Sequence, residues 1–193
     1  MGQDIIARIV SQLEESASIK RRIVETCLDE LVRAAEMLVE TYRQERKVLL
    51  CGNGGSAADA QHLAAELVSK LTRERKALPA LALTVNASLL TCIPNDSSFD
   101  QVFARQVEAL GQPGDTLIAL STSGRSANVN AAVLAARERG MHTIALTGKD
   151  GGELAKLAEL SIVVPADNTQ RIQEGHITIG HILCDIVEAA LFD

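Results

Sequence analysis

Two polar segments of this chain carry residue types suited to binding an anion. Residues 51–56 read Cys-Gly-Asn-Gly-Gly-Ser, and residues 121–126 read Ser-Thr-Ser-Gly-Arg-Ser. Each segment follows an apolar run and precedes a helical pattern, so each would place free N–H groups at the positive end of a helix. Two phosphate-sized sites on one sheet indicate that the ligand is a phosphorylated small molecule.

The glycine segment would bind an anion or a sugar oxygen through its backbone. Gly52, Gly54 and Gly55 allow left-handed backbone conformations and a close approach of the ligand. The segment lacks the glycine spacing of a dinucleotide fingerprint and the Gly-Lys-Ser/Thr of a P-loop. On this segment alone, a purely structural turn remains the alternative. Asn53 is the polar side chain of the segment that could contact a ligand.

The serine segment offers more hydroxyls than a helix cap requires. Its hydroxyl residues are Ser121, Thr122, Ser123 and Ser126. One hydroxyl is enough to cap a helix, and the others can donate to phosphate oxygens. We therefore favour phosphate binding over capping alone. Arg125 either adds positive charge to this site or lies in solvent.

Two helical patterns carry polar residues that could hold a metal ion or move protons. His62 and Glu66 are four residues apart and share one helix face, although an ordinary polar contact is the simpler alternative. Gln173 and His181 interrupt an apolar pattern and lie about 80° apart around a helix axis, so they can face one cavity. His176 lies about 140° from His181, and a buried structural histidine is its alternative role.

Asn95 and Asp96 follow the apolar run 89–94 and could donate or accept hydrogen bonds with a sugar. A turn or a helix cap is an equally good interpretation of this pair. Sequence spacing does not decide between the two.

The elements that must position these residues alternate along the chain. We predict strands at 47–51, 80–84, 115–120, 142–147 and 160–164. We predict helices at 55–73, within 86–110, and at 126–139, 151–157 and 170–191. The runs at 48–51, 116–120 and 143–146 are apolar throughout, which is typical of strands covered on both faces by helices. The sequence therefore predicts an α/β fold with a doubly wound parallel sheet in a single domain, residues 1–193.

Residues 1–45 form an N-terminal extension of two predicted helices. These helices carry apolar positions at helical spacing, and an apolar stripe must be buried somewhere. We expect them to pack against a second subunit, so self-association is the favoured state.

Composition excludes several classes of function. The chain has 193 residues, a net charge of −6 and an isoelectric point near 5.3. It therefore has no basic footprint for nucleic acid and no polybasic stretch for a membrane surface. We see no secretory signal pattern and expect a cytoplasmic protein. The 4 cysteines are far apart in the sequence, so buried free thiols are expected rather than disulfides.

Five ordered motifs together resemble the phosphoheptose isomerases of the sugar isomerase (SIS) superfamily. The motifs occupy residues 51–67, 94–107, 121–129, 145–155 and 171–188. The resemblance covers nearly the whole chain. It implies an SIS-type three-layer α/β/α sandwich, a homotetramer, and conversion of sedoheptulose 7-phosphate to D-glycero-D-manno-heptose 7-phosphate through an enediol. That reaction would serve the synthesis of heptoses for bacterial lipopolysaccharide or other surface glycans.

The resemblance also implies roles for individual residues. It places one zinc ion per subunit on His62, Glu66, Gln173 and His181. It places the substrate on Asn53, Gly54, Gly55, Glu66, Asn95, Asp96, Ser121, Thr122, Ser123, Ser126 and Gln173. Glu66 would be the base that moves the carbon proton, and His181 its acid/base partner.

Two departures from the family pattern bear on specificity. Lys70 stands where many relatives have Arg, and Lys cannot make a bidentate contact. Arg125 replaces a common Asn. Three alternatives stay open: an isomerase of another sugar phosphate, a regulatory SIS protein that binds the bacterial replication initiator, or a sugar-phosphate sensor without catalysis. The relatives of the second kind lack the carboxylate at the position of Glu66.

Overall fold

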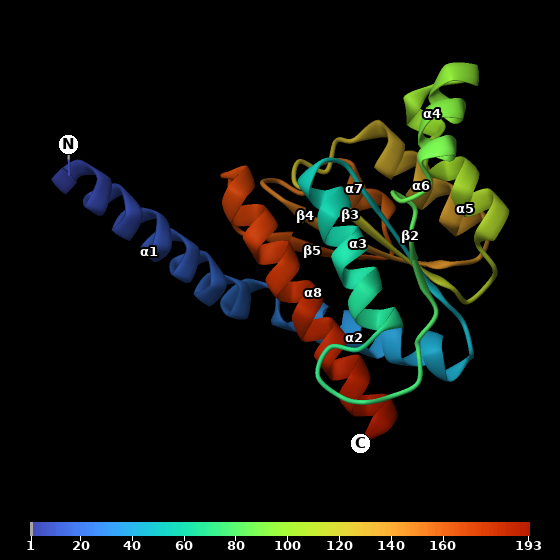
Figure 1. Ribbon diagram of the computed structural model, residues 1–193, viewed down its shortest axis with the longest axis horizontal. Coiled ribbons are helices and arrows are strands. Elements are labelled where there is room, and N and C mark those ends of the chain that lie inside the picture. Colours follow the sequence, from blue (N-terminus) through green and yellow to red (C-terminus); the bar gives the residue numbers. More distant parts are fainter. Residues whose placement is uncertain (1) are drawn as a thin grey trace.

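The computed structural model describes residues 2–193 and contains one parallel β-sheet at its centre (Figure 1). The strands are β1 (Val48–Gly52), β2 (Ala80–Ala82), β3 (Thr116–Ser121), β4 (His142–Gly148) and β5 (Leu160–Val164). Their order in the sheet is β2-β1-β3-β4-β5, and every neighbouring pair is parallel. The predicted doubly wound sheet is confirmed.

Helices cover both faces of the sheet. The helices are α1 (Gly2–Thr26), α2 (Leu28–Arg43), α3 (Gly55–Val68), α4 (Ala87–Asp96), α5 (Ala104–Leu110), α6 (Ala127–Glu138), α7 (Leu154–Leu157) and α8 (Thr169–Phe192), with a 3₁₀ turn, η1 (Phe99–Gln101). One core cluster joins the sheet to α1, α2, α3 and α8, and the other joins it to α5, α6 and α7. The three-layer sandwich is therefore confirmed.

The uniformly apolar strands follow from this arrangement. Along β1, Val48 and Leu50 belong to the first cluster, whereas Leu49 and Cys51 belong to the second. All four side chains are fully buried. Because successive side chains of a strand point to opposite faces, a strand with helices on both sides must be apolar at every position.

Helix α1 extends beyond the body of the protein, with the N-terminal end far from the sheet (Figure 1). In the described part of the chain, its buried residues are Ile19 and Ile23, near its C-terminal end. Ile5, Ile9 and Leu13 are more than half exposed. The predicted pair of N-terminal helices is present, and most of the apolar stripe on α1 has no cover within this chain.

Helix α3 is shorter than predicted: it ends at Val68 and not at residue 73. The N–H groups of Leu71, Thr72 and Arg73 donate to the buried carboxylate of Glu188 instead of to carbonyls of a continuing helix. Lys70 therefore lies in a loop, where its ammonium pairs with the Glu74 carboxylate.

Helix α8 crosses the sheet side by side with α3 (Figure 1). By length and composition it is apolar enough to span a membrane, with a mean hydropathy of 1.3 in its most apolar window. It also contributes Ile172, Ile179, Leu183 and Val187 to the first core cluster. Its apolar composition is thus accounted for by its place in the core.

The cysteine prediction is correct for three thiols and wrong for one. Cys27, Cys51 and Cys184 are buried and free, whereas Cys92 on α4 is free and exposed. Burial raises the pKa of the Cys51 and Cys184 thiols to about 12. These two side chains act as small apolar residues of the core.

The buried imidazole of His176 predicts an acid-sensitive fold. Burial lowers its pKa to about 4, and its Nε2 lies 3.1 Å from the Thr147 carbonyl oxygen. Below about pH 6.5 the unfolded chain takes up a proton that the folded chain does not. The free energy of unfolding should therefore fall by up to about 3 kcal/mol as the pH drops from 6.5 to 4. Urea titrations at fixed protein concentration measure this slope. His176→Gln should flatten it, and an unchanged slope in that variant would show that other groups dominate.

Candidate functional site

The glycine and serine segments meet at the point where the strand order reverses. The connection after β1 leads to β2 on one side of the sheet, while β3 lies on the other side of β1. The segment 52–55 follows β1, and the segment 121–126 follows β3, so both lie at the carboxyl ends of neighbouring strands. In open α/β sheets, ligands bind in the crevice outside such a switch point.

A reciprocal pair of hydrogen bonds joins the two segments. Asn53 Nδ2 donates to Asn128 Oδ1 at 2.8 Å, and Asn128 Nδ2 donates back to Asn53 Oδ1 at 2.9 Å. Asn128 is buried in the first turn of α6. This amide pair fixes the distance between the glycine segment and the serine segment. Asn128 lies in the motif at residues 121–129, but its type and spacing in the sequence did not indicate a role for it.

The hydroxyls of the serine segment are not used up by capping. Ser126 occupies the N-cap position of α6, yet its side chain makes no capping hydrogen bond. The hydroxyl oxygens of Ser121 and Ser126 lie 3.0 Å apart, and Ser123 Oγ accepts the Arg125 N–H at 3.2 Å. Thr122 is half-buried. Hydroxyl and N–H donors therefore converge at one helix N-terminus, which is an arrangement suited to phosphate.

The turn at residue 124 requires a glycine, because the backbone of the loop after β4 packs directly against it. Gly124 has a φ of +64°, and a Cβ built on it would lie 1.9 Å from the carbonyl oxygen of Gly151. The Arg125 guanidinium pairs with the Asp150 carboxylate at 2.5 Å, between the same two loops. The hydrogen bond from Arg125 lowers the pKa of the Asp150 carboxyl. Arg125 thus bridges the loops after β3 and β4, and its guanidinium is already paired.

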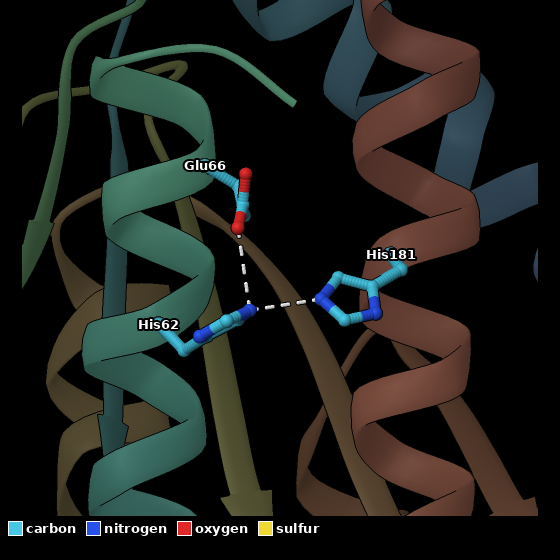
Figure 2. A group of neighbouring side chains, drawn as sticks. All are labelled: His62, Glu66 and His181. Atoms are coloured by element: carbon cyan, nitrogen blue, oxygen red, sulfur yellow. Dashed lines mark hydrogen bonds and ion pairs between the residues drawn. The ribbon is translucent and has the colours of Figure 1, made fainter. Parts of the chain in front are cut away.

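Helices α3 and α8 bring three titratable side chains together (Figure 2). His62 Nε2 lies 2.9 Å from His181 Nε2 and 3.3 Å from Glu66 Oε1. One ligand atom from each of the three residues lies within 4.8 Å of the other two. His62 and Glu66 share one face of α3, as their spacing predicts, and His181 on α8 lies next to His62.

This cluster fits a divalent metal ion. Two imidazole nitrogens and a carboxylate oxygen form the donor set of a catalytic zinc site, which keeps a further position open. The two Nε2 atoms face each other, and a shared cation satisfies both without requiring a proton on either. The three side chains are therefore close enough to share one ion.

Asp59 adds negative charge one turn before His62. Burial raises the pKa of its carboxyl, while His62 and His181 lower it. Its buried Oδ2 has no hydrogen-bond partner in the described part of the chain. A carboxylate beside two imidazoles favours a bound cation. Its position three residues before His62, on the same helix face, was the sequence signal for it, and we did not single it out.

Gln173 lies at the other end of this helix pair. Its half-buried side chain packs against the start of α3, and a Cβ on Gly55 would lie 2.4 Å from Gln173 Nε2. The bare backbone at Gly55 therefore makes room for this amide. The exposed Gly54 precedes it with a φ of +56°. The structure places Gln173 beside the glycine segment, and its metal contact stays a prediction.

Asn95 and Asp96 are not gathered with the other predicted residues. They form the exposed end of α4, where Asn95 Nδ2 donates to Asp96 Oδ1 at 2.7 Å. Helix α4 projects from the body of the protein, away from α3 and α8 (Figure 1). Their contact with a sugar stays a prediction.

The sequence is similar to known proteins over nearly its whole length. The SIS domain family matches residues 12–148. The phosphoheptose isomerase of Roseiflexus sp. (strain RS-1) is 55% identical over 185 residues, which cover 96% of this chain and 94% of that protein. This chain belongs to the phosphoheptose isomerase family. The phosphoheptose isomerase of Sulfurimonas denitrificans is 49% identical and covers 95% of each chain.

Solved structures of the family have the same fold. Phosphoheptose isomerase GmhA from Neisseria gonorrhoeae superposes with a TM-score of 0.91 at 45% identity and covers 96% of this chain and 99% of its own. A phosphoheptose isomerase from Francisella tularensis superposes with a TM-score of 0.92 at 38% identity, covering 95% and 98%. The similarity therefore includes both the sheet and the helices that carry the cluster.

The close contact at Gly124 gives a prediction about the serine segment. Gly124→Ala adds both left-handed strain and a collision with the Gly151 backbone. Gly140→Ala is a matched control, because Gly140 has a φ of +72° but its nearest neighbour would be Pro113 Cβ at 3.5 Å. Urea denaturation should show that Gly124→Ala lowers the free energy of unfolding by about 2 kcal/mol more than the control does. Equal losses would mean that the loops separate freely.

Proposed function

We propose that this protein is a ketose-aldose isomerase that converts sedoheptulose 7-phosphate to D-glycero-D-manno-heptose 7-phosphate. The observation that carries the proposal is the convergence of His62, Glu66 and His181 between α8 and α3, the helix that begins at the glycine segment of the switch point. The full-length similarity to phosphoheptose isomerases supports the choice of substrate. The product would serve bacterial heptose synthesis in the cytoplasm.

The reaction needs a base and an oxygen-directed acid on neighbouring carbons. A proton must leave the carbon next to the carbonyl and return to the adjacent carbon through an enediol. We assign the carbon proton to the Glu66 carboxylate. His181, across from it on α8, would exchange protons with the oxygens. Their positions on two different helices allow both to flank the substrate.

The phosphate would be held remote from the reacting carbons. We assign it to the four hydroxyl residues Ser121, Thr122, Ser123 and Ser126, with Asn53, Gly54 and Gly55 contacting the sugar. Binding energy from the phosphate can then position the reacting carbons. Gln173, Asn95 and Asp96 complete the proposed substrate contacts.

One zinc ion per subunit would be held by His62, Glu66, His181 and Gln173. When bound, it would act as a Lewis acid on substrate oxygens and so stabilise the charge that develops there. The proximity of His62, Glu66 and His181 supports these three ligands, whereas Gln173, which lies beside Gly55, is assigned by the resemblance alone.

Turnover of sedoheptulose 7-phosphate by the zinc-supplemented protein tests this assignment. NMR should show the aldose heptose phosphate forming, and Glu66→Gln should reduce kcat by about 10²- to 10⁴-fold, since it removes the proposed base. Glu108→Gln is the matched control, because Glu108 is exposed on α5, on the opposite face of the sheet. It should leave kcat unchanged.

Two other outcomes would redirect the assignment. Turnover of a different sugar phosphate only would reject the substrate but keep the chemistry. Binding of the sugar phosphate without any turnover would favour the regulatory alternative, and a pull-down with the replication initiator would then test it.

We further propose that the protein is a homotetramer assembled through its N-terminal helices. A largely apolar groove lies between α1, α2 and α8, lined by Val24, Leu28, Val32, Ile182 and Ile186 among others. These five side chains are each more than a third exposed. The groove continues the uncovered apolar stripe of α1, and burying both against further copies would remove this area from water.

Size-exclusion chromatography with light scattering should give the mass of four chains. Val32→Glu puts a charge into the groove and should shift the mass towards smaller species. Leu134→Glu is the matched control, because Leu134 is similarly exposed on α6, outside the groove. A monomeric wild-type protein would reject the tetramer.

A further inference from the structure

A buried carboxylate ties the loop after α3 to α8. Glu188 lies on α8 and is fully buried. Its Oε1 accepts the Leu71 N–H at 2.7 Å, and its Oε2 accepts the N–H groups of Thr72 and Arg73 at 3.0 and 3.2 Å. Burial alone would raise the pKa of Glu188, but these donors and Arg75 lower it to about 2. The carboxylate is therefore charged and fully partnered inside the protein.

Arg75 connects this carboxylate to the end of α3. Its Nε donates to Glu188 Oε1 at 2.8 Å, and its side chain is 1% exposed. Its Nη2 donates to the Glu66 carbonyl oxygen at 2.8 Å, and its Nη1 donates to the Leu67 carbonyl oxygen at 2.9 Å. These are carbonyls of the last helical turn, which have no partner within the helix. Arg75 thus holds the backbone of the residue assigned as the base.

Glu188 lies on the same face of α8 as His181. Glu188 follows His181 by seven residues, which is close to two full helical turns and leaves the two side chains about 20° apart around the axis. His181 contacts His62 on α3, and Glu188 contacts Arg75, whose guanidinium binds the last turn of α3. The clamp of Arg75 and Glu188 therefore joins the two helices whose separation sets the distance between Glu66 and His181.

We infer that Arg75 and Glu188 are positioning residues that hold Glu66 in register with His181 across the α3–α8 pair. This inference rests on the proposed isomerase function. A buried ion pair adds little net stability compared with apolar residues, but its geometry tolerates little displacement. A displacement of about 1 Å at a reacting group can reduce a rate by about a hundredfold. The phosphate loops are fixed separately by the pair of Asn53 and Asn128.

Steady-state kinetics of Arg75→Lys and Glu188→Gln tests the clamp. Lysine keeps the charge but cannot reach Glu188 and both carbonyls at once. Both variants should lower kcat for sedoheptulose 7-phosphate about 10-fold or more and leave KM within about twofold. Arg75→Lys, the milder change, keeps the test valid where Glu188→Gln fails to fold. Arg73→Ala is the matched control, because Arg73 lies on the same loop as Arg75 but its side chain pairs with Asp185 on α8 and with Asp193 at the end of α8.

Titration of the metal-free protein with Co²⁺, followed by visible absorption, gives a readout independent of turnover. The clamp variants should bind Co²⁺ about 10-fold more weakly than wild type, and Arg73→Ala should bind it normally. Folded clamp variants with normal kcat and normal Co²⁺ affinity would overturn the inference, as would equal losses in the control. A wild type that binds Co²⁺ but does not isomerise the sugar would reject the proposed function, and the Co²⁺ affinities would still decide the clamp.

Discussion

The parallel pairing of β1 with β3 is the constraint on which the site depends. Because these strands run side by side in the same direction, the segments after them leave the sheet at the same edge. The chain then turns away from β1 towards β2 on one side, so no crossover covers the space between the two segments. The two hydrogen bonds between Asn53 and Asn128 fix the distance between the two segments. Loops and helix N-termini at such an edge bind anions without any charged side chain of their own.

The second constraint is the close approach of α3 and α8. A Cβ on Gly180 would lie 2.5 Å from the methyl groups of Leu63, so the absence of a side chain there lets the helices meet. His181 is the next residue, and the small separation brings its ring within 5.0 Å of His62, centroid to centroid. The metal-suited cluster therefore depends on a helix packing that apolar and glycine residues create. Polar function and core packing share the same two helices.

The order of elements follows from local patterns in the sequence. Apolar runs at 48–51, 116–120 and 143–146 predicted β1, β3 and β4, because strands covered on both faces are typically apolar at successive positions, and the alternation of elements predicted β5. The two long N-terminal helices and α8 followed from apolar residues at helical spacing. The position where α3 ends did not, since it depends on Glu188, which lies 117 residues from Leu71 in the sequence. The role of Asn128 did not follow either, because it depends on Asn53, which lies 75 residues away in the sequence.

The sequence by itself therefore determined the order of helices and strands, the parallel sheet and the chemical types available for a site. Spacing put His62 and Glu66 on one face, since that relation is internal to one helix. Tertiary structure alone decided that His181 Nε2 lies 2.9 Å from His62 Nε2, while Asn95 and Asp96 lie apart on α4. The physical reason is that local propensity and periodicity act over a few residues. Contacts between distant helices depend instead on the packing of complete surfaces, which no local pattern encodes.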